Sequence, residues 1–191
     1  IFNGNGYYEE WVAEAERRGI PNIKSMLEAV DTLVTDKSVK LFEKFGIFTR
    51  AELESRAEIL YETYAKTINI EALTMIEMAS KQIIPAVIGY TRTLAETIIA
   101  VREAGADASA QTELLQAVSE KLSAMKSALE RLKEAEAEAG EIKDAREQAF
   151  YYKDVVKVIM DELRRPADEA EMLVDKKVWP IPTYGDLIFE L

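Results

Sequence analysis

Apolar residues recur at helical spacing over a long stretch in the middle of the chain. Thr49, followed three residues later by Glu52, has the form of a capping box, which predicts a helix that begins near Arg50. No stop signal follows before Gly105. Within this segment the apolar positions advance by four and three residues, as in an amphipathic helix. They are Ile68, Ala72, Met75, Ala79, Ile83, Ala86, Tyr90, Leu94, Ile98 and Val101.

A second apolar stripe occupies the opposite side of this predicted helix between residues 70 and 88. Its members are Ile70, Leu73, Ile76, Ile84 and Val87. Because a helix that is apolar on two sides is normally covered on two sides, we expect both stripes to be buried. Pro85 removes a backbone donor and crowds the preceding turn, so it predicts a kink rather than an end, and Gly89 would ease the bend.

The spacing tightens into heptads after a predicted turn at residues 105–109. The first seam, at alternating steps of three and four, consists of Leu115, Val118, Leu122, Met125, Leu129 and Leu132. Gly140 is expected to end this helix. A second seam of the same spacing follows from Ile142 to Leu163, and Arg165-Pro166 is expected to interrupt it. Short turns between comparable helices make antiparallel neighbours. We therefore predict an all-α fold with a long antiparallel three-helix bundle over residues 49–175, its helices lying near 50–104, 110–139, 141–165 and 166–175.

Two shorter segments flank the predicted bundle. Residues 1–48 have the pattern of short helices and are expected to form an N-terminal arm or cap, in which Asp36 caps a helix that Gly46 stops. Residues 176–191 form a Pro/aromatic C-terminal tail, where two X-Pro bonds from Trp179 to Pro182 favour extended backbone. Because this tail is strongly apolar, we expect it to dock, either on the bundle or on another part of a longer protein.

Composition and charge exclude several function classes. The 191 residues contain neither Cys nor His, and 24 basic against 35 acidic side chains give a net charge of −11. The missing Cys and His exclude disulfides, thiolate or imidazole metal sites, a cysteine nucleophile and the usual catalytic triad. The acidic charge disfavours nucleic acid and anionic lipid. We expect a protein without a membrane span, located in the cytoplasm and cut from a longer polypeptide, because the sequence opens with Ile rather than Met.

Candidate sites in the sequence all have simpler explanations. A ferritin-like di-metal site needs inward-facing Glu-x-x-His pairs, which a chain without His cannot supply. The Asn3–Gly6 turn lacks the strand, the glycine spacing and the Lys-Ser/Thr of a phosphate loop. Arg164 and Arg165 suit a helix C-terminus, and the aromatics Trp179 and Tyr184 suit an anchored terminus. Met75, Met78 and Met125 are interpreted as core filler. The sequence therefore predicts no catalytic, cofactor-binding or metal-binding residues in this segment.

Particular strings nevertheless resemble a known family, the type III glutamine synthetases. The resemblance is carried by Asn3–Tyr7 with Glu10-Trp11 and Glu14–Gly19, by Ser38–Arg56, by Lys66–Tyr90 and by Leu163–Phe189. It covers nearly the whole chain, whereas the stretch from Arg102 to Gln148 is generic coiled-coil-like sequence. The match is to the region that follows the catalytic domain in that family.

The resemblance implies a parent enzyme that joins ammonia to glutamate with ATP and Mg or Mn, as a large oligomer of stacked rings. The family's catalytic residues precede this region, so none is carried over to the present chain. This segment is then expected to be a non-catalytic helical C-terminal domain that supports subunit packing, with the catalytic domain of the same chain and neighbouring subunits as partners. Two alternatives stay open at this point: a regulatory module that binds a partner or effector, and a free-standing coiled-coil adaptor.

Overall fold

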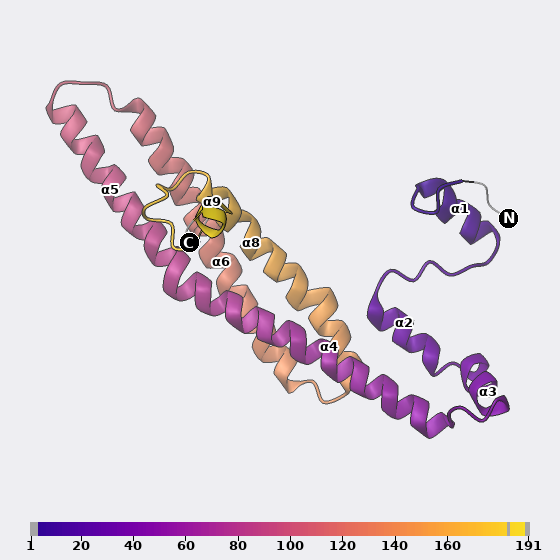
Figure 1. Cartoon of the computed structure of the whole chain (residues 1–191). Coiled ribbons are helices and arrows are strands. Elements are labelled where there is room, and N and C mark those ends of the chain that lie inside the picture. Colours follow the sequence, from indigo (N-terminus) through magenta and orange to yellow (C-terminus); the bar gives the residue numbers. More distant parts are fainter. Residues whose placement is uncertain (1–3, 183, 190–191) are drawn as a thin grey trace. The chain divides into compact units, whose positions relative to one another are not determined.

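A computed structural model describes residues 4–182 and 184–189, and within these ranges the secondary structure is entirely helical (Figure 1). The predicted all-α class is therefore confirmed. Contacts within the chain divide it into two compact units, Ile1–Thr63 and Tyr64–Leu191, and the division falls inside α4 (Arg50–Met78). The predicted segment boundaries at 48 and 175 stay predictions. Residues 1–3, 183, 190 and 191, which belong to the predicted arm and tail, lie outside the described ranges.

The first unit contains α1 (Glu9–Arg17), α2 (Met26–Leu33), α3 (Asp36–Lys44) and the beginning of α4. Its buried large aliphatic side chains are Leu27, Val30, Val39 and Leu53. α4 begins at Arg50, as the capping box predicts: the Thr49 amide donates to Glu52 Oε2 at 2.8 Å, and the Glu52 amide donates to Thr49 Oγ1 at 3.4 Å.

The cap of α3 differs from the prediction. Thr35, not Asp36, is the N-cap, and its hydroxyl oxygen accepts a hydrogen bond from the Ser38 amide. Asp36 instead lies in the first turn, where a carboxylate also faces the positive end of the helix dipole. Gly46 ends the helix as predicted: it adopts φ +61°, and the Ile47 amide then reaches the Phe42 carbonyl at 3.0 Å.

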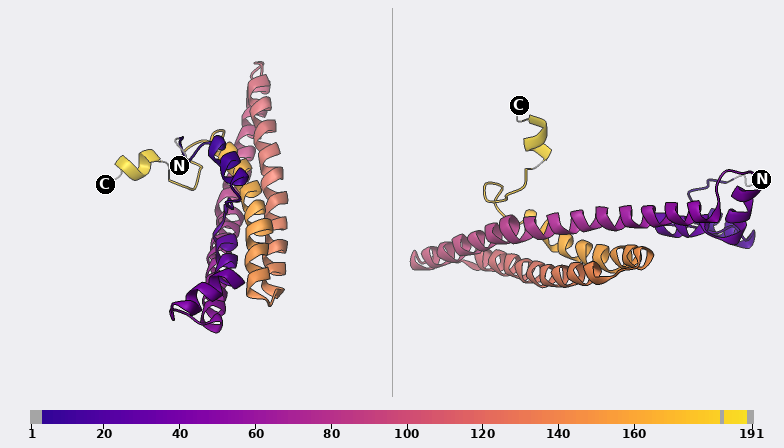
Figure 2. Two further views of the ribbon diagram at one scale, coloured as in Figure 1. Left: turned by 90° about the vertical axis from the view of Figure 1, so that its right-hand side faces the viewer. Right: turned by 90° about the horizontal axis from the view of Figure 1, so that it is seen from below.

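The second unit is built on α6 (Ser109–Glu141), which packs against both α5 (Ile84–Glu103) and α8 (Lys157–Glu171). These helices are visible in the three views of Figures 1 and 2. Gly105 reverses the chain between α5 and α6 with φ +77°, a backbone conformation that glycine adopts without strain. Along α6 the predicted seam supplies four buried side chains, Val118, Met125, Leu129 and Leu132. The unit also contains α7 (Ala145–Tyr151) and α9 (Tyr184–Phe189).

Two predicted helix ends are wrong. α6 continues through Gly140 to Glu141, because one glycine costs only about 1 kcal/mol in a helix and the neighbouring Ala139 is fully buried. α8 likewise continues through Pro166 to Glu171. Pro166 is itself buried, together with Ala167 and Ala170, so apolar packing offsets the backbone hydrogen bond that the proline removes.

The long helix accommodates Pro85 by a change of helix type. A π-helical turn, η1 (Ala79–Ile83), lies between α4 and α5, and Pro85 falls in the first turn of α5, where a missing amide is tolerated. A second π-helical turn, η2 (Tyr152–Val156), separates α7 from α8. Pro85 thus does not end the helix, in agreement with the sequence, and the expected kink stays a prediction.

The second apolar stripe is not buried as a whole, contrary to the prediction. Val87 is fully buried, but Ile70 is 65% exposed and Leu73 is 47% exposed. The periodicity correctly identified an apolar face, but among the described residues Ile70 and Leu73 stay largely uncovered. In the tail, Trp179 is buried and residues 179–182, which contain the two X-Pro bonds, are not helical, whereas the remainder of the tail includes the short helix α9 (Tyr184–Phe189).

Candidate interaction surfaces

The described residues contain no group of three or more His, Cys, Asp or Glu side chains that could hold a metal ion. Arg164, expected from the sequence at a helix C-terminus, instead lies within α8 and donates a hydrogen bond to Asp168 Oδ2 at 3.2 Å. Asn3 lies outside the described residues, so the Asn3–Gly6 turn stays a prediction. The described residues do present exposed apolar surfaces.

Large apolar side chains are exposed on α4 and α5 of the second unit. Ile88 is 52% exposed and Ile99 is 58% exposed on α5, in addition to Ile70 and Leu73 on α4. Among the described residues, the helical stretch Arg50–Glu103 is long and apolar enough to cross a membrane, judged by length and composition alone. Of the apolar 18-residue segment within it, 22% is buried. One such helix is weak evidence for a membrane span, because core helices of soluble proteins pass the same test. An exposed apolar face is equally what a protein interface needs.

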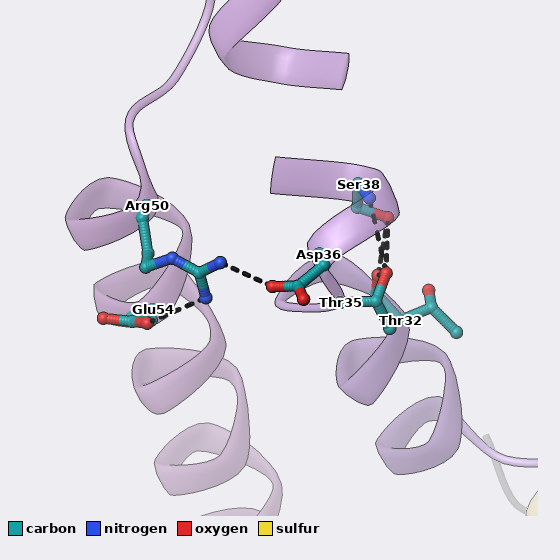
Figure 3. Close-up of polar contacts among 6 residues, drawn as sticks. All are labelled: Thr32, Thr35, Asp36, Ser38, Arg50 and Glu54. Carbon is teal, nitrogen blue, oxygen red and sulfur yellow. Dashed lines mark hydrogen bonds and ion pairs between the residues drawn. The ribbon is translucent and has the colours of Figure 1, made fainter. Parts of the chain in front are cut away.

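The first unit also presents apolar side chains, around the turn between α3 and α4. Leu41, Phe45 and Ile47 are 54%, 65% and 55% exposed. Polar contacts fix the backbone that carries them, as Figure 3 shows. Arg50 Nη2 donates to Asp36 Oδ1 at 2.7 Å, and Arg50 Nη1 lies 3.7 Å from Glu54 Oε1 (Figure 3). The Arg50–Asp36 bond joins the N-terminal turns of α3 and α4, whereas the Arg50–Glu54 pair lies within α4.

Residues of α3 are linked to the end of α2 in the same close-up. The Ser38 hydroxyl donates to the Thr32 carbonyl oxygen at 2.7 Å, and the Thr35 hydroxyl donates to the same oxygen at 2.9 Å (Figure 3). Thr35 therefore satisfies a free carbonyl at the end of one helix while its oxygen caps the next. The guanidinium of Arg50 holds the pKa of the Asp36 carboxyl below its usual value, mainly through their hydrogen bond.

A polar network inside the second unit fixes the alignment of three segments. The Asn69 side-chain amide, on α4, donates to Glu136 Oε1 of α6 and to the Tyr152 hydroxyl oxygen of η2, both at 2.9 Å. Tyr152 is only 3% exposed, and its burial raises the pKa of the phenol. Glu136 and Tyr152 lie 67 and 83 positions from Asn69 in the sequence. Their bonds to Asn69 therefore form only when the three segments have one relative register.

A groove in the second unit is lined mostly by apolar side chains and has a volume of about 1040 Å³. Four of the chain's six methionines line it, and we refer to it as the methionine groove. Met125 and Met160 are buried there, whereas Met75 and Met78 are half-buried. The lining comprises Ile70, Glu71, Thr74, Met75, Met78, Ala79, Ile83, Met125, Lys157, Met160, Asp161, Leu163, Arg164, Ala167, Asp168, Glu171, Trp179, Ile181, Pro182 and Leu187.

Sequence reasoning missed this groove because it treated the methionines only as core filler. For Met125 that interpretation is confirmed, since its side chain is fully buried. Met75 and Met78 lie one helical turn apart on α4 and face the groove beside Trp179 of the tail. The signal that could have revealed the groove is the concentration of methionines on helices that the heptad pattern already brings together.

Comparison with known proteins identifies relatives over the whole chain. A family model described as "Glutamine synthetase C-terminal domain" matches residues 1–102. A glutamine synthetase of Butyrivibrio fibrisolvens is 40% identical over 193 residues, which cover 100% of this chain and 28% of the relative. A type-3 glutamine synthetase of Dictyostelium discoideum is 30% identical and covers 99% of this chain and 26% of the relative. A glutamine synthetase of Bacteroides fragilis is 30% identical, with 98% and 27% covered. The chain thus spans about a quarter of the length of these curated relatives.

Proposed function

Because this chain belongs to the glutamine synthetase C-terminal domain family, we propose that it is the non-catalytic helical C-terminal domain of a type III glutamine synthetase and that it supports subunit packing and oligomer assembly. The proposed parent enzyme ligates ammonia to glutamate in the cytoplasm, using ATP and Mg or Mn bound outside this segment. The proposed partners are the catalytic domain of the same polypeptide and neighbouring subunits. Family membership gives no support to the free-standing adaptor.

The observation that carries the assembly role is the exposure of large apolar side chains on regular helices. Most of the exposed large hydrophobic residues of the described chain lie within residues 1–102, the part that the family model matches. Exposed apolar patches on helices are typical of protein interfaces, since covering them removes apolar surface from water. In our proposal an antiparallel bundle of α5, α6 and α8 provides the rigid support, and the exposed faces of α4, α5 and the α3–α4 turn make the contacts.

The assembly role is tested in the full-length enzyme by light scattering, which measures the mass of the oligomer. Ile88→Ser combined with Ile99→Ser makes the exposed face of α5 polar and is expected to yield smaller assemblies. Val158→Ser combined with Met172→Ser is the matched control, because these side chains on and just after α8 are also exposed, at 50% and 84%. An unchanged oligomer mass for the α5 variant, and also for Phe45→Ser combined with Ile47→Ser, would rule out the assembly role.

The non-catalytic assignment has a separate test. The isolated 191-residue chain is assayed for glutamine formation with ATP, glutamate, ammonia and Mg²⁺. We expect no product above the rate without protein, because the described residues offer no metal-binding group and the sequence contains no imidazole or thiol. ATP-dependent glutamine formation by this segment alone would overturn the assignment.

A further inference from the structure

We propose that the methionine groove binds a basic amphipathic helix of a partner protein. This inference goes beyond the assembly role: the groove shares Ile70 of α4 with the proposed assembly surface, but the α5 residues Ile88 and Ile99 that the assembly test changes do not line it. The groove has two properties that together define the chemistry of its occupant: a deformable apolar floor and an acidic rim.

The floor of the groove suits large apolar side chains presented by a helix. Met75, Met78, Met125 and Met160 contribute unbranched, polarisable thioethers that adapt their rotamers to the shape of a ligand. Methionine-rich surfaces are used where one site accepts apolar anchors spaced along an amphipathic helix. At about 1040 Å³ the groove is at the upper end of the range for ligand pockets, so it has room for several such anchors.

The rim of the groove carries an excess of negative charge. Glu71, Asp161, Asp168 and Glu171 line it, against the two cations Lys157 and Arg164. Arg164 is engaged by Asp168 at 3.2 Å, which leaves three carboxylates facing one lysine. A helix whose apolar face is flanked by Lys or Arg would pair with these carboxylates, and the overall charge of −11 would steer it toward the protein. The charge therefore selects a basic rather than an acidic partner.

The groove also contains an intrinsic fluorophore, Trp179. This side chain lines the groove and is 9% exposed, and its Nε1 has no hydrogen-bond partner among the described residues. A buried donor without an acceptor lowers the stability of the chain. Because Trp179 lines the groove, its fluorescence reports the arrival of the partner.

The probes are two synthetic 18-residue peptides with Leu at the same helical positions, one with Lys and one with Glu at the polar positions. They are titrated into the full chain carrying Trp11→Phe, so that Trp179 is the only tryptophan. The Lys peptide is expected to change the emission of Trp179 and to bind at least tenfold more tightly than the Glu peptide. Equal affinity for the two peptides, or an unchanged Trp179 emission at saturation, would overturn the proposal.

Charge variants distinguish binding of the Lys peptide at the groove from its non-specific attraction to an acidic protein. Asp161→Asn combined with Glu171→Gln removes two rim carboxylates and is expected to weaken binding of the Lys peptide at least fivefold. Glu113→Gln combined with Glu134→Gln removes the same charge from exposed positions of α6 outside the groove and should change the affinity less than twofold. Equal weakening by both pairs would show that binding is non-specific and would contradict the proposal.

Two further measurements complete the test. Met78→Gln, at a half-buried position, makes the floor more polar and should weaken binding while circular dichroism confirms an unchanged helix content. The Lys peptide is also titrated into the full-length enzyme carrying Trp11→Phe. Binding there with the same dependence on Asp161 and Glu171 supports the proposal. Absence of binding in the longer protein, with binding retained in the 191-residue chain, would show that the polypeptide itself covers the groove and would overturn it.

Discussion

At the scale of single residues, the start of α4 depends on the reciprocal hydrogen bonds between Thr49 and Glu52. Thr49→Ala removes the hydroxyl that accepts from the Glu52 amide, so we expect the free energy of unfolding to fall by about 1 kcal/mol, as for other N-caps. Urea denaturation followed by circular dichroism measures the change. Ser55→Ala is the control, because Ser55 is exposed in the second turn of α4 and alanine is the better helix former there. A loss of similar size in the control would contradict the capping role.

The titration of Tyr151 is a second prediction at this scale. Its hydroxyl donates to Glu138 Oε2 at 2.5 Å, and this bond, with a smaller contribution from burial, raises the pKa of Tyr151 to about 12. The folded pKa lies above the ordinary tyrosine value of 10.0, so the stabilisation is fully present below pH 10 and is lost as the pH rises through about 12. Absorbance at 295 nm should show a tyrosine step near pH 12 that disappears in Tyr151→Phe. A step that remains in this variant would belong to another residue.

At the scale of helices, the alignment of α4, α6 and η2 depends on Asn69. Asn69→Ala leaves the partly buried Glu136 carboxylate and the Tyr152 hydroxyl without their shared donor, which should cost roughly 1–3 kcal/mol of unfolding free energy. Gln116→Ala, which removes an exposed amide from α6, should change stability by less than about 0.5 kcal/mol. A double-mutant cycle with Tyr152→Phe measures the coupling, and strict additivity of the two changes would show that the bond contributes nothing.

The same helices show how far the sequence could predict the structure. The capping box at Thr49, the stop at Gly46 and the seam of Val118 and Leu132 depend on local hydrogen bonds and periodicity, and each is confirmed. Asn69 gave no such signal, because its partners depend on how segments distant in sequence align along their axes. The exposed Ile70 shows a related limit, since an apolar pattern does not reveal whether the covering surface belongs to the same chain.

The methionine groove could not be predicted for both of these reasons: the alignment of distant segments and the unknown covering surface. Its floor lies on α4, α6 and α8, where regular apolar spacing predicts helices, but its opening depends on where the tail places Trp179. No periodicity in the sequence specifies that placement. The sequence could therefore predict that these helices have apolar faces, but it could not predict that the faces form a groove or an interaction surface.

At the scale of the whole molecule, the two compact units differ in how much apolar surface they bury. Few large side chains are buried in residues 4–63, among them Leu27, Val39 and Leu53, and several others there are exposed. The second unit buries apolar side chains of α6 from Val118 to Ala139. Since the stability of a small unit depends on its buried apolar area, the first unit should open more readily than the second.

Hydrogen–deuterium exchange of backbone amides tests this difference directly. In the 191-residue chain, the amides of α2 and α3 should exchange at least tenfold faster than those of α6 around Met125, because opening of the first unit does not require α6 to unfold. In the full-length enzyme the amides of α2 and α3 should exchange more slowly. In our proposal other parts of the assembly cover the exposed side chains Leu41, Phe45 and Ile47. Protection around Met125 serves as the internal reference, because that residue is already fully buried in this chain. Equal exchange of α2, α3 and α6 in the 191-residue chain would contradict the difference in stability. Unchanged protection of α2 and α3 in the full-length enzyme would instead place the interface elsewhere, because a covered apolar surface must stabilise the helices that carry it.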